Sequence, residues 1–160
     1  MEQTYLEIIG TIERLHRQFL EVVKHELDRM GVEDINNIQT LILFNIGRDE
    51  VTVGELTARG YYLGSNVSYN LKKMVESGYL EQKRSTHDRR SVRVSASQKG
   101  RDLCVQVADM YKRHVERLPE ENIGQEDLRT ATETLKGLGR FWIEEAREVS
   151  AVVPFPKMTA

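Results

Sequence analysis

The stretch GYLEQKRSTHDRRSVRVSAS, residues 78–97, decides the fold predicted for this chain. Residues 79–83 read as a strand, and over 91–96 valine or alanine alternates with polar residues, which is typical of a half-buried strand. A tight hairpin normally turns on Asn-Gly or Asp-Gly. Here the six residues 85–90, Ser-Thr-His-Asp-Arg-Arg, separate the two strands instead. The stretch therefore predicts a two-stranded ribbon with a charged, projecting tip.

Two short helices are predicted directly before this ribbon. Thr52-Val53-Gly54-Glu55 has the Thr-x-x-Glu form of a capping box, so a helix begins there and runs towards Arg59. Glycines at 60 and 64 interrupt it, and a second helix begins at or near Ser65 and ends before Gly78. Its apolar positions recur at helical spacing: Val67, Leu71, Met74 and Val75. Two helices joined by a short glycine-containing turn predict a helix-turn-helix.

The face opposite that apolar stripe carries side chains that suit DNA. Lysine neutralises phosphates, while asparagine, serine and tyrosine form hydrogen bonds with base edges or with the backbone. The candidate residues of this recognition helix are Ser65, Asn66, Ser68, Tyr69, Lys72 and Lys73. On this pattern alone, an ordinary solvated helix face is an open alternative.

The tip of the ribbon supplies a second group of candidate contacts. An arginine on a narrow tip can enter a minor groove, where negative potential is concentrated. We expect Asp88 to pair with a neighbouring arginine and to hold the loop in shape before binding. The candidate wing residues are Arg84, His87, Asp88, Arg89 and Arg90. The order helix, helix, strand, charged loop, strand is that of a winged helix.

Charge is distributed unevenly along the chain. Its formal net charge at pH 7 is −2. Residues 61–101 hold nine Lys or Arg and three Asp or Glu, a net of +6, so the remaining 14 basic and 22 acidic residues sum to −8. A basic segment in an acidic body indicates an anion-binding module, although charges that merely cluster on a solvated surface would give the same count.

Three short motifs carry a resemblance to a known family: Gly78-Tyr79-Leu80-Glu81, the run DRRSVRVS over 88–95, and Gln98-Lys99-Gly100. With these motifs and the order of elements over 3–150, the chain resembles the MarR-type winged-helix transcription regulators. The resemblance implies a homodimer that binds palindromic double-stranded DNA, with one recognition helix per half-site. It also implies that Arg90 enters the minor groove with Asp88 as its partner.

The turn between the two motif helices, residues 59–65, departs from the Leu-Gly-Leu-Ser form that is usual in this family. This difference shifts the expected helix start, and with it the contacts of Ser65 and Asn66, by a residue or so. The variant YYLGSNVSYNLKKMVESGYL resembles the subgroup that includes the LdtR regulators of cell-wall transpeptidases.

The family resemblance also implies a crevice that binds a small aromatic or anionic effector. The candidate lining residues are His16, Phe19, Phe44 and Tyr62. Ordinary core and boundary packing is the alternative role for these four side chains.

Long amphipathic helices flank the predicted DNA-binding domain, over 3–30, 98–118 and 125–149. A more apolar helix over 35–46, with Asp34 as its cap, is expected in the core. The apolar stripes of the flanking helices would be exposed in a monomer, so we expect them to pack against a second chain, with an extra helical layer inside one chain as the alternative. The candidate dimer contacts are Leu6, Ile9, Leu135, Leu138 and Trp142.

The expected fold class is mainly α with a small β-hairpin wing. We expect a helical dimerisation region formed by 1–33 and 98–150, and a winged helix-turn-helix domain over 34–97. Residues 151–160 form a tail or an arm against the partner.

Other function classes find little support in the sequence. It contains no H-E-x-x-H, CxxC, phosphate-cradling glycine loop or G-x-S-x-G motif, so we predict no enzyme, no metal and no cofactor. The lone Cys104 is expected to be a buried structural residue rather than a redox-sensitive thiol. Without a signal peptide or a long apolar run, the chain is expected to be cytoplasmic with no membrane partner. The alternative function is a winged helix that docks a protein and binds no DNA.

Overall fold

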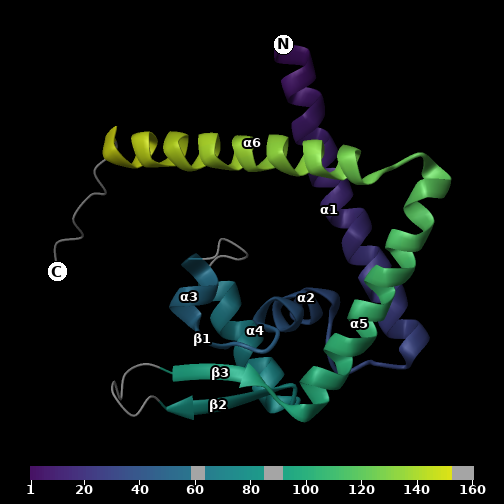
Figure 1. Ribbon diagram of the computed structural model, residues 1–160. Helices are drawn as coiled ribbons and strands as arrows, with labels where there is room; N and C mark the ends of the chain where they lie inside the picture. The colour runs from purple at the N-terminus through teal and green to yellow at the C-terminus, as the bar shows by residue number, and fades with distance from the viewer. Residues whose placement is uncertain (59–63, 85–91, 153–160) are drawn as a thin grey trace. The chain divides into compact units, whose positions relative to one another are not determined.

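The computed structural model describes residues 1–58, 64–84 and 92–152, which form a series of helices and one small antiparallel sheet (Figure 1). Side chains at 58, 64, 65, 84 and 149–152 are not described. The elements are α1 (Glu2–Met30), α2 (Asn37–Ile46), β1 (Glu50–Thr52), α3 (Val53–Ala58), α4 (Gly64–Glu76), β2 (Leu80–Arg84), β3 (Val92–Ala96), α5 (Gln98–Arg117), the 3₁₀ helix η1 (Leu118–Glu121) and α6 (Gln125–Val152). The predicted class, mainly α with a small β wing, is confirmed.

The sheet has three strands, one more than the sequence predicted. Its order is β1-β3-β2, and both pairings are antiparallel. In β1, Val51 is buried and lies opposite Val94. Three residues are too few to display an alternating pattern, which is why β1 was not predicted. The alternation predicted for β3 is present, because Val94 and Ala96 are buried and Arg93 is half-buried.

The N-termini of two helices show how local sequence decides their position. At α3, the predicted capping box is confirmed: the Thr52 hydroxyl accepts from Glu55 N–H at 3.1 Å, and Glu55 accepts from Thr52 N–H. At α2, the predicted cap was wrong. The capping residue is Asn36, which forms a reciprocal box with Gln39, and the helix begins at Asn37. Asp34 instead binds side chains of distant elements.

Side chains of the five helices α1–α5 and of the sheet form one hydrophobic core in the compact unit Met1–Tyr111. The predicted core position of α2 is confirmed, since Ile42, Leu43 and Ile46 are almost fully buried. Burying a side chain of this size contributes about 1.5–3 kcal/mol relative to leaving it exposed. The other large contributors are Val23, Leu27, Val51, Leu56, Val67, Leu71, Met74, Val94, Leu103, Val107 and Met110.

The second compact unit, Lys112–Ala160, contains the end of α5, η1 and α6. Pro119 stands in the first turn of η1, and Asn122 ends that turn with a positive φ of 58°. The helix predicted over 125–149 is present and extends to Val152. The predicted arm lies mostly at 153–160, outside the described residues.

Candidate nucleic-acid interface

Helix α4 is fixed to the core by its apolar stripe. Val67, Leu71 and Met74 are buried, which leaves the opposite side of the helix in solvent. The helix ends in a Schellman motif: Tyr79 N–H donates to Met74 C=O at 2.9 Å, and Gly78 N–H donates to Val75 C=O at 3.1 Å. Gly78 has a φ of +77°, a left-handed conformation that glycine adopts without strain. These contacts determine which face of α4 is exposed.

The exposed face of α4 carries the polar residues that the sequence predicted. Asn66, Ser68, Tyr69, Lys72 and Lys73 are all exposed, and Tyr69 keeps 62% of its surface in solvent. Ser65 belongs to the first turn, but its side chain is not described. The structure therefore brings five of the six predicted recognition-helix side chains to one surface. A convex helical face with amide, hydroxyl, phenol and ammonium groups has the chemistry for phosphates and base edges.

Both lysines of this face have the same carboxylate neighbour. Lys73 Nζ lies 2.9 Å from Glu76 Oε2, and Lys72 Nζ lies 4.0 Å from Glu76 Oε1. The hydrogen bond from Lys73 holds the pKa of Glu76 below its usual value, and the same bond raises the pKa of Lys73. Exposed pairs of this kind contribute little to stability, so the lysines can exchange Glu76 for a phosphate at small cost.

A polar contact that the sequence did not reveal holds α4 against α2. Gln39 Nε2 donates to Asn70 Oδ1 at 3.2 Å, and Asn70 Nδ2 donates to the Asn66 carbonyl at 2.8 Å. Gln39 is buried, and its side-chain oxygen also completes the capping box of α2. The sequence signal for this contact is weak, because Gln39 is one of several polar residues in α2. The pair gives α4 a defined rotation on α2.

Three residues of the basic segment bind parts of the protein itself. Arg93 Nη2 donates to the Glu50 carbonyl at 3.0 Å and lies 3.6 Å from Glu55 Oε1. Lys99 pairs with Asp34, and Arg101 Nη1 donates to the Ala96 carbonyl at 2.6 Å. The net charge of +6 counted along residues 61–101 therefore overstates the charge that this segment offers to a ligand.

The wing is described as far as the paired ends of its strands. Arg84 of β2 lies opposite Val92 of β3, and these are the last described positions before and after residues 85–91. The candidate contacts His87, Asp88, Arg89 and Arg90 lie outside the described residues, as does the side chain of Arg84. Their contacts stay a prediction.

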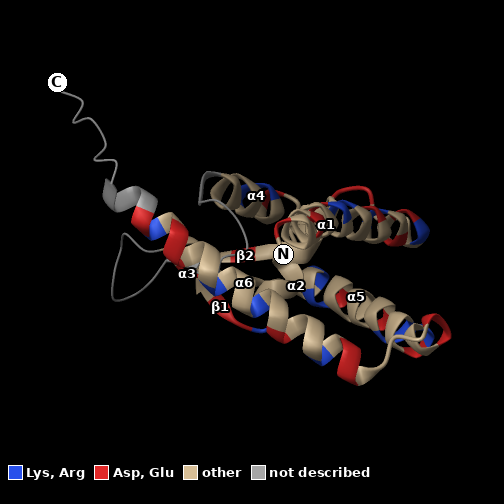
Figure 2. Cartoon of the chain, turned by 90° about the horizontal axis from the view of Figure 1, so that it is seen from above, with Lys and Arg blue, Asp and Glu red and all other residues tan. Residues whose placement is uncertain are grey.

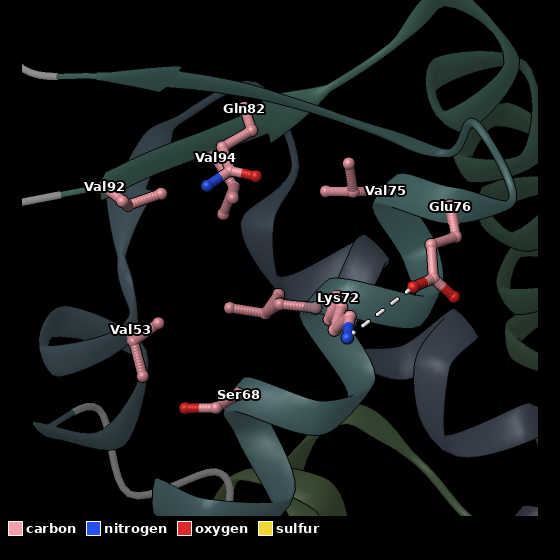
Figure 3. Close-up of a pocket in the computed structure, with 9 residues that line it drawn as sticks. Val53, Ser68, Lys72, Val75, Glu76, Gln82, Val92 and Val94 are labelled. Atoms are coloured by element: carbon pink, nitrogen blue, oxygen red, sulfur yellow. Dashed lines mark ion pairs between the residues drawn. The ribbon is translucent and has the colours of Figure 1, made fainter.

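A mostly apolar recess of about 520 Å³ lies between α4, the start of α3 and the two wing strands (Figure 3). Val53, Val75, Val92 and Val94 line it, together with Leu71. Its polar lining residues are Ser68, Lys72, Glu76 and Gln82. Two of these, Ser68 and Lys72, also belong to the exposed face of α4, so the recess adjoins the predicted DNA surface.

The predicted effector residues are only partly brought together. Phe19 and Phe44 both contact Tyr111, with ring centroids 6.1 Å and 5.1 Å away. His16 is exposed on α1, and Tyr62 lies outside the described residues. Tyr111 was not among the candidates, although it stands on the apolar stripe of its helix. Burial raises the pKa of its phenol.

The predicted dimer contacts include side chains that stay in solvent in the single chain. Leu6 is 62% exposed and Leu135 is 46% exposed, whereas Ile9, Leu138 and Trp142 are half-buried. Figure 2 shows charges of both signs distributed along α6. Other large apolar residues of this helix are also exposed: Leu128, Phe141 and Ile143.

Two further expectations concern Cys104 and membranes. Cys104 is half-buried, and this burial raises the pKa of its thiol, which disfavours the reactive thiolate. Within the described residues, no helix combines the length and apolar character that crossing a bilayer requires.

Comparisons with known proteins agree with this geometry. Residues 33–91 match a model described as MarR family. The chain is 39% identical over 144 residues to ExpG of Rhizobium meliloti strain 1021, the exopolysaccharide II synthesis transcriptional activator, an alignment that covers 90% of this chain and 74% of ExpG. The match extends over both the winged region and the flanking helices, and it favours DNA binding over the protein-docking alternative.

Two solved structures share the fold. One is Streptococcus pneumoniae FabT in complex with DNA, with a TM-score of 0.70 at 22% identity, covering 88% of this chain and 98% of FabT. The other is Staphylococcus aureus MarR in complex with salicylate and kanamycin, with a TM-score of 0.72 at 20% identity, covering 90% of this chain and 95% of that protein.

Proposed function

This chain belongs to the MarR family of DNA-binding transcription regulators, which is not a family of enzymes, and we propose that it acts as a homodimer on a palindromic operator. The observation that carries the proposal is the exposed polar face of α4, held outward by a buried apolar stripe. In a dimer, two such faces related by a two-fold axis match two half-sites about one helical turn of DNA apart.

In this proposal, α4 enters the major groove. Lys72 and Lys73 bind phosphates, while Asn66, Ser68 and Tyr69, with Ser65 in the first turn, form hydrogen bonds or apolar contacts with bases and backbone. The charge of Glu76 beside the lysines is displaced from them when phosphates take its place. Phosphate contacts give affinity and register, and the contacts to base edges give specificity.

The wing is proposed to enter the adjacent minor groove. Arg90 is the inserted side chain, and Asp88 pairs with it before binding so that less rotamer entropy is lost. Arg84, His87 and Arg89 are proposed to contact the neighbouring phosphates. The support for this role is the sequence pattern and the antiparallel pairing that extends to Arg84 and Val92.

The dimer is proposed to form through the flanking helices. Residues 1–33 and 98–150 form the dimerisation region, 34–97 form the winged domain, and 151–160 form a tail or arm. The exposed apolar side chains of α1 and α6, among them Leu6 and Leu135, support this division because large apolar patches mark interaction surfaces. Ile9, Leu138 and Trp142 complete the proposed interface.

We also propose that a small aromatic or anionic effector regulates binding. The solved structure of S. aureus MarR is a complex with salicylate and kanamycin. The proposed site includes the aromatic cluster of Phe19 and Phe44, with His16 and Tyr62. An effector can act only through different affinities for the DNA-competent and DNA-incompetent arrangements of the dimer.

Two finer assignments complete the proposal. The sequence over 61–80 supports placing the chain in the LdtR-like subgroup. A regulator has to reach the chromosome, so we place the protein in the cytoplasm.

The test is selection of bound sequences from a random duplex pool, followed by affinity measurements on the selected site over a salt series. We expect a palindromic site, two protomers per site by analytical ultracentrifugation, and a steep fall in affinity with salt. Lys72→Gln should reduce the salt slope by about one.

Lys24→Gln is the matched control. Lys24 is also exposed and also pairs with a carboxylate one turn away, Asp28 at 2.9 Å, but it lies on α1. Its salt slope should equal that of the wild type. No enrichment from the pool, or one protomer bound to an asymmetric site, would contradict the proposal.

A further inference from the structure

Three residues from separate parts of the chain meet at the carboxyl end of α4. Asp34 precedes α2, Tyr79 follows α4, and Lys99 lies in the first turn of α5. The Tyr79 hydroxyl donates to Asp34 Oδ1 at 2.6 Å, and Lys99 Nζ donates to Asp34 Oδ2. Lys99 Nζ also donates to the Ser77 carbonyl at 3.0 Å and stands 4.1 Å above the centre of the Tyr79 ring. We call Asp34, Tyr79 and Lys99 the junction cluster.

The backbone around the junction cluster is closely fitted. Ser97, the residue before α5, donates its N–H to the Tyr79 carbonyl at 3.0 Å and its hydroxyl to the Gly78 carbonyl at 2.6 Å. The same hydroxyl accepts from Gly100 N–H at 3.0 Å. A Cβ placed on Gly100 would lie 2.2 Å from the Tyr79 carbonyl oxygen, which shows how closely α5 approaches this segment.

The exposure of these side chains indicates that the junction cluster affects the orientation of α4 and α5 more than the stability of the fold. The Asp34 and Lys99 side chains are 54% and 47% exposed, and ion pairs at such exposure contribute little to the free energy of unfolding. Tyr79 is only 2% exposed, so its hydroxyl has one fixed position from which to donate. The Ser77 carbonyl lies directly after the last residue of α4, and Lys99 of α5 donates to it. The cluster thus defines an angle between α4 and α5 more than it stabilises the fold.

We propose that the junction cluster is a positioning device, which makes α4 and the first half of α5 move as one body and so sets the half-site spacing that the dimer accepts. The inference rests on the proposed function, because α5 belongs to the proposed dimerisation region. A fixed angle between α4 and α5 sets the separation of the two recognition helices. If the angle between α4 and α5 can vary, each winged domain can adapt to other half-site separations. The domain then has to be ordered when DNA binds, which costs free energy.

The test compares affinities for the selected operator and for operators with one base pair added or removed between half-sites. One base pair shifts a half-site by about 3.4 Å and rotates it by about 35°. Two variants probe the cluster: Tyr79→Phe removes one hydrogen bond and keeps the ring, and Lys99→Met keeps the apolar stem. Each should lower the ratio of affinities for the selected over the altered spacing about three- to tenfold.

This ratio is a readout that simple destabilisation does not change. A partly unfolded variant, or one that has lost a phosphate contact, loses affinity for all spacings by the same factor. Lys24→Met is the control, since it breaks an ion pair within one helix and should leave the ratio unchanged. All proteins are measured below their melting transitions, with the dimer verified by ultracentrifugation.

The outcomes separate the inference from the proposed function. A reduced ratio in both cluster variants supports the inference. An unchanged ratio in both, or a wild-type protein that binds every spacing equally, overturns the inference and leaves the proposed function in place. A wild-type protein that binds no palindrome overturns the proposed function and the inference with it.

Discussion

Two groups of basic residues stand close in the sequence and differ in what they bind. Lys72 and Lys73 lie on one exposed helix, and their neighbour Glu76 belongs to the same helix. Arg93 and Lys99 instead bind groups on other elements: Arg93 joins β3 to β1 and α3, and Lys99 joins α5 to Asp34 and to the end of α4. The two lysines paired within one helix stay available to a ligand. Arg93 and Lys99, which pair between elements, instead hold parts of the protein together.

The largest effect that tests this comparison is expected at Gly100. In Gly100→Ala the new Cβ would lie 2.2 Å from the Tyr79 carbonyl oxygen, a backbone atom that cannot move without displacing α5. We expect a loss of about 2 kcal/mol or more in the free energy of unfolding, measured by urea denaturation.

Gly139→Ala is the control for helix propensity. Gly139 lies in α6, and its Cβ would meet no atom within 4 Å. This variant should be neutral or more stable by up to about 1 kcal/mol. Equal changes in the free energy of unfolding for the two variants would show that α5 is not tightly packed against the segment that follows α4.

A smaller effect is expected for Arg93→Gln, which sharpens the contrast with Lys72→Gln. The Arg93 variant loses its ion pairs to Glu50 and Glu55 and should be destabilised by about 1 kcal/mol by urea denaturation. The salt slope of its DNA binding should equal that of the wild type, because the guanidinium is already engaged by the protein. A slope reduced as in Lys72→Gln would place Arg93 among the phosphate contacts.

The smallest effect concerns the pH dependence of Asp34. Hydrogen bonds from Lys99, first, and from Tyr79 hold the pKa of Asp34 below its usual value. A carboxyl group whose pKa is lower in the folded state stabilises the fold above its unfolded pKa, and this contribution is lost as the pH falls through the folded pKa. The stability difference between wild type and Asp34→Asn should be constant from pH 5 to 8 and shrink below about pH 4.

The control for that measurement is Glu133→Gln, which replaces an exposed carboxylate on α6 outside the cluster and is compared under the same conditions. A difference that grows as the pH falls would mean that Asp34 is bound in its protonated form, which contradicts the observed contacts.

Much of the fold could be predicted because its signals are local. The capping box at Thr52 and Glu55, the alternation of β3 and the stripes of the long helices each depend on neighbours in sequence. Other features depend on residues that are far apart in the chain. Strand β1 is too short to be recognised without its pairing partner β3, and two distant donors bind the carboxylate of Asp34, the residue predicted as the cap of α2. The Asn36–Gln39 box that caps α2 is itself local and was missed.

The exposed face of α4 could likewise be predicted, because helical spacing alone separates Val67, Leu71 and Met74 from Asn66, Tyr69 and Lys72. The Gln39–Asn70 pair and the contact of Tyr111 with two phenylalanines could not, because each joins residues far apart in the chain. Side chains of similar type give no sequence signal of which distant partner they meet.

The sequence by itself determined the order of elements, the wing strands and the face of α4 that stays polar, since these follow from periodicities of two and 3.6 residues and from capping groups nearby. Only the tertiary structure decided which basic residues are already bound by the protein and how α4 is held to α5. The physical reason is that an ion pair or a close backbone approach depends on distance in space, and the packing of the core brings Asp34 to Lys99 across 65 positions of the chain.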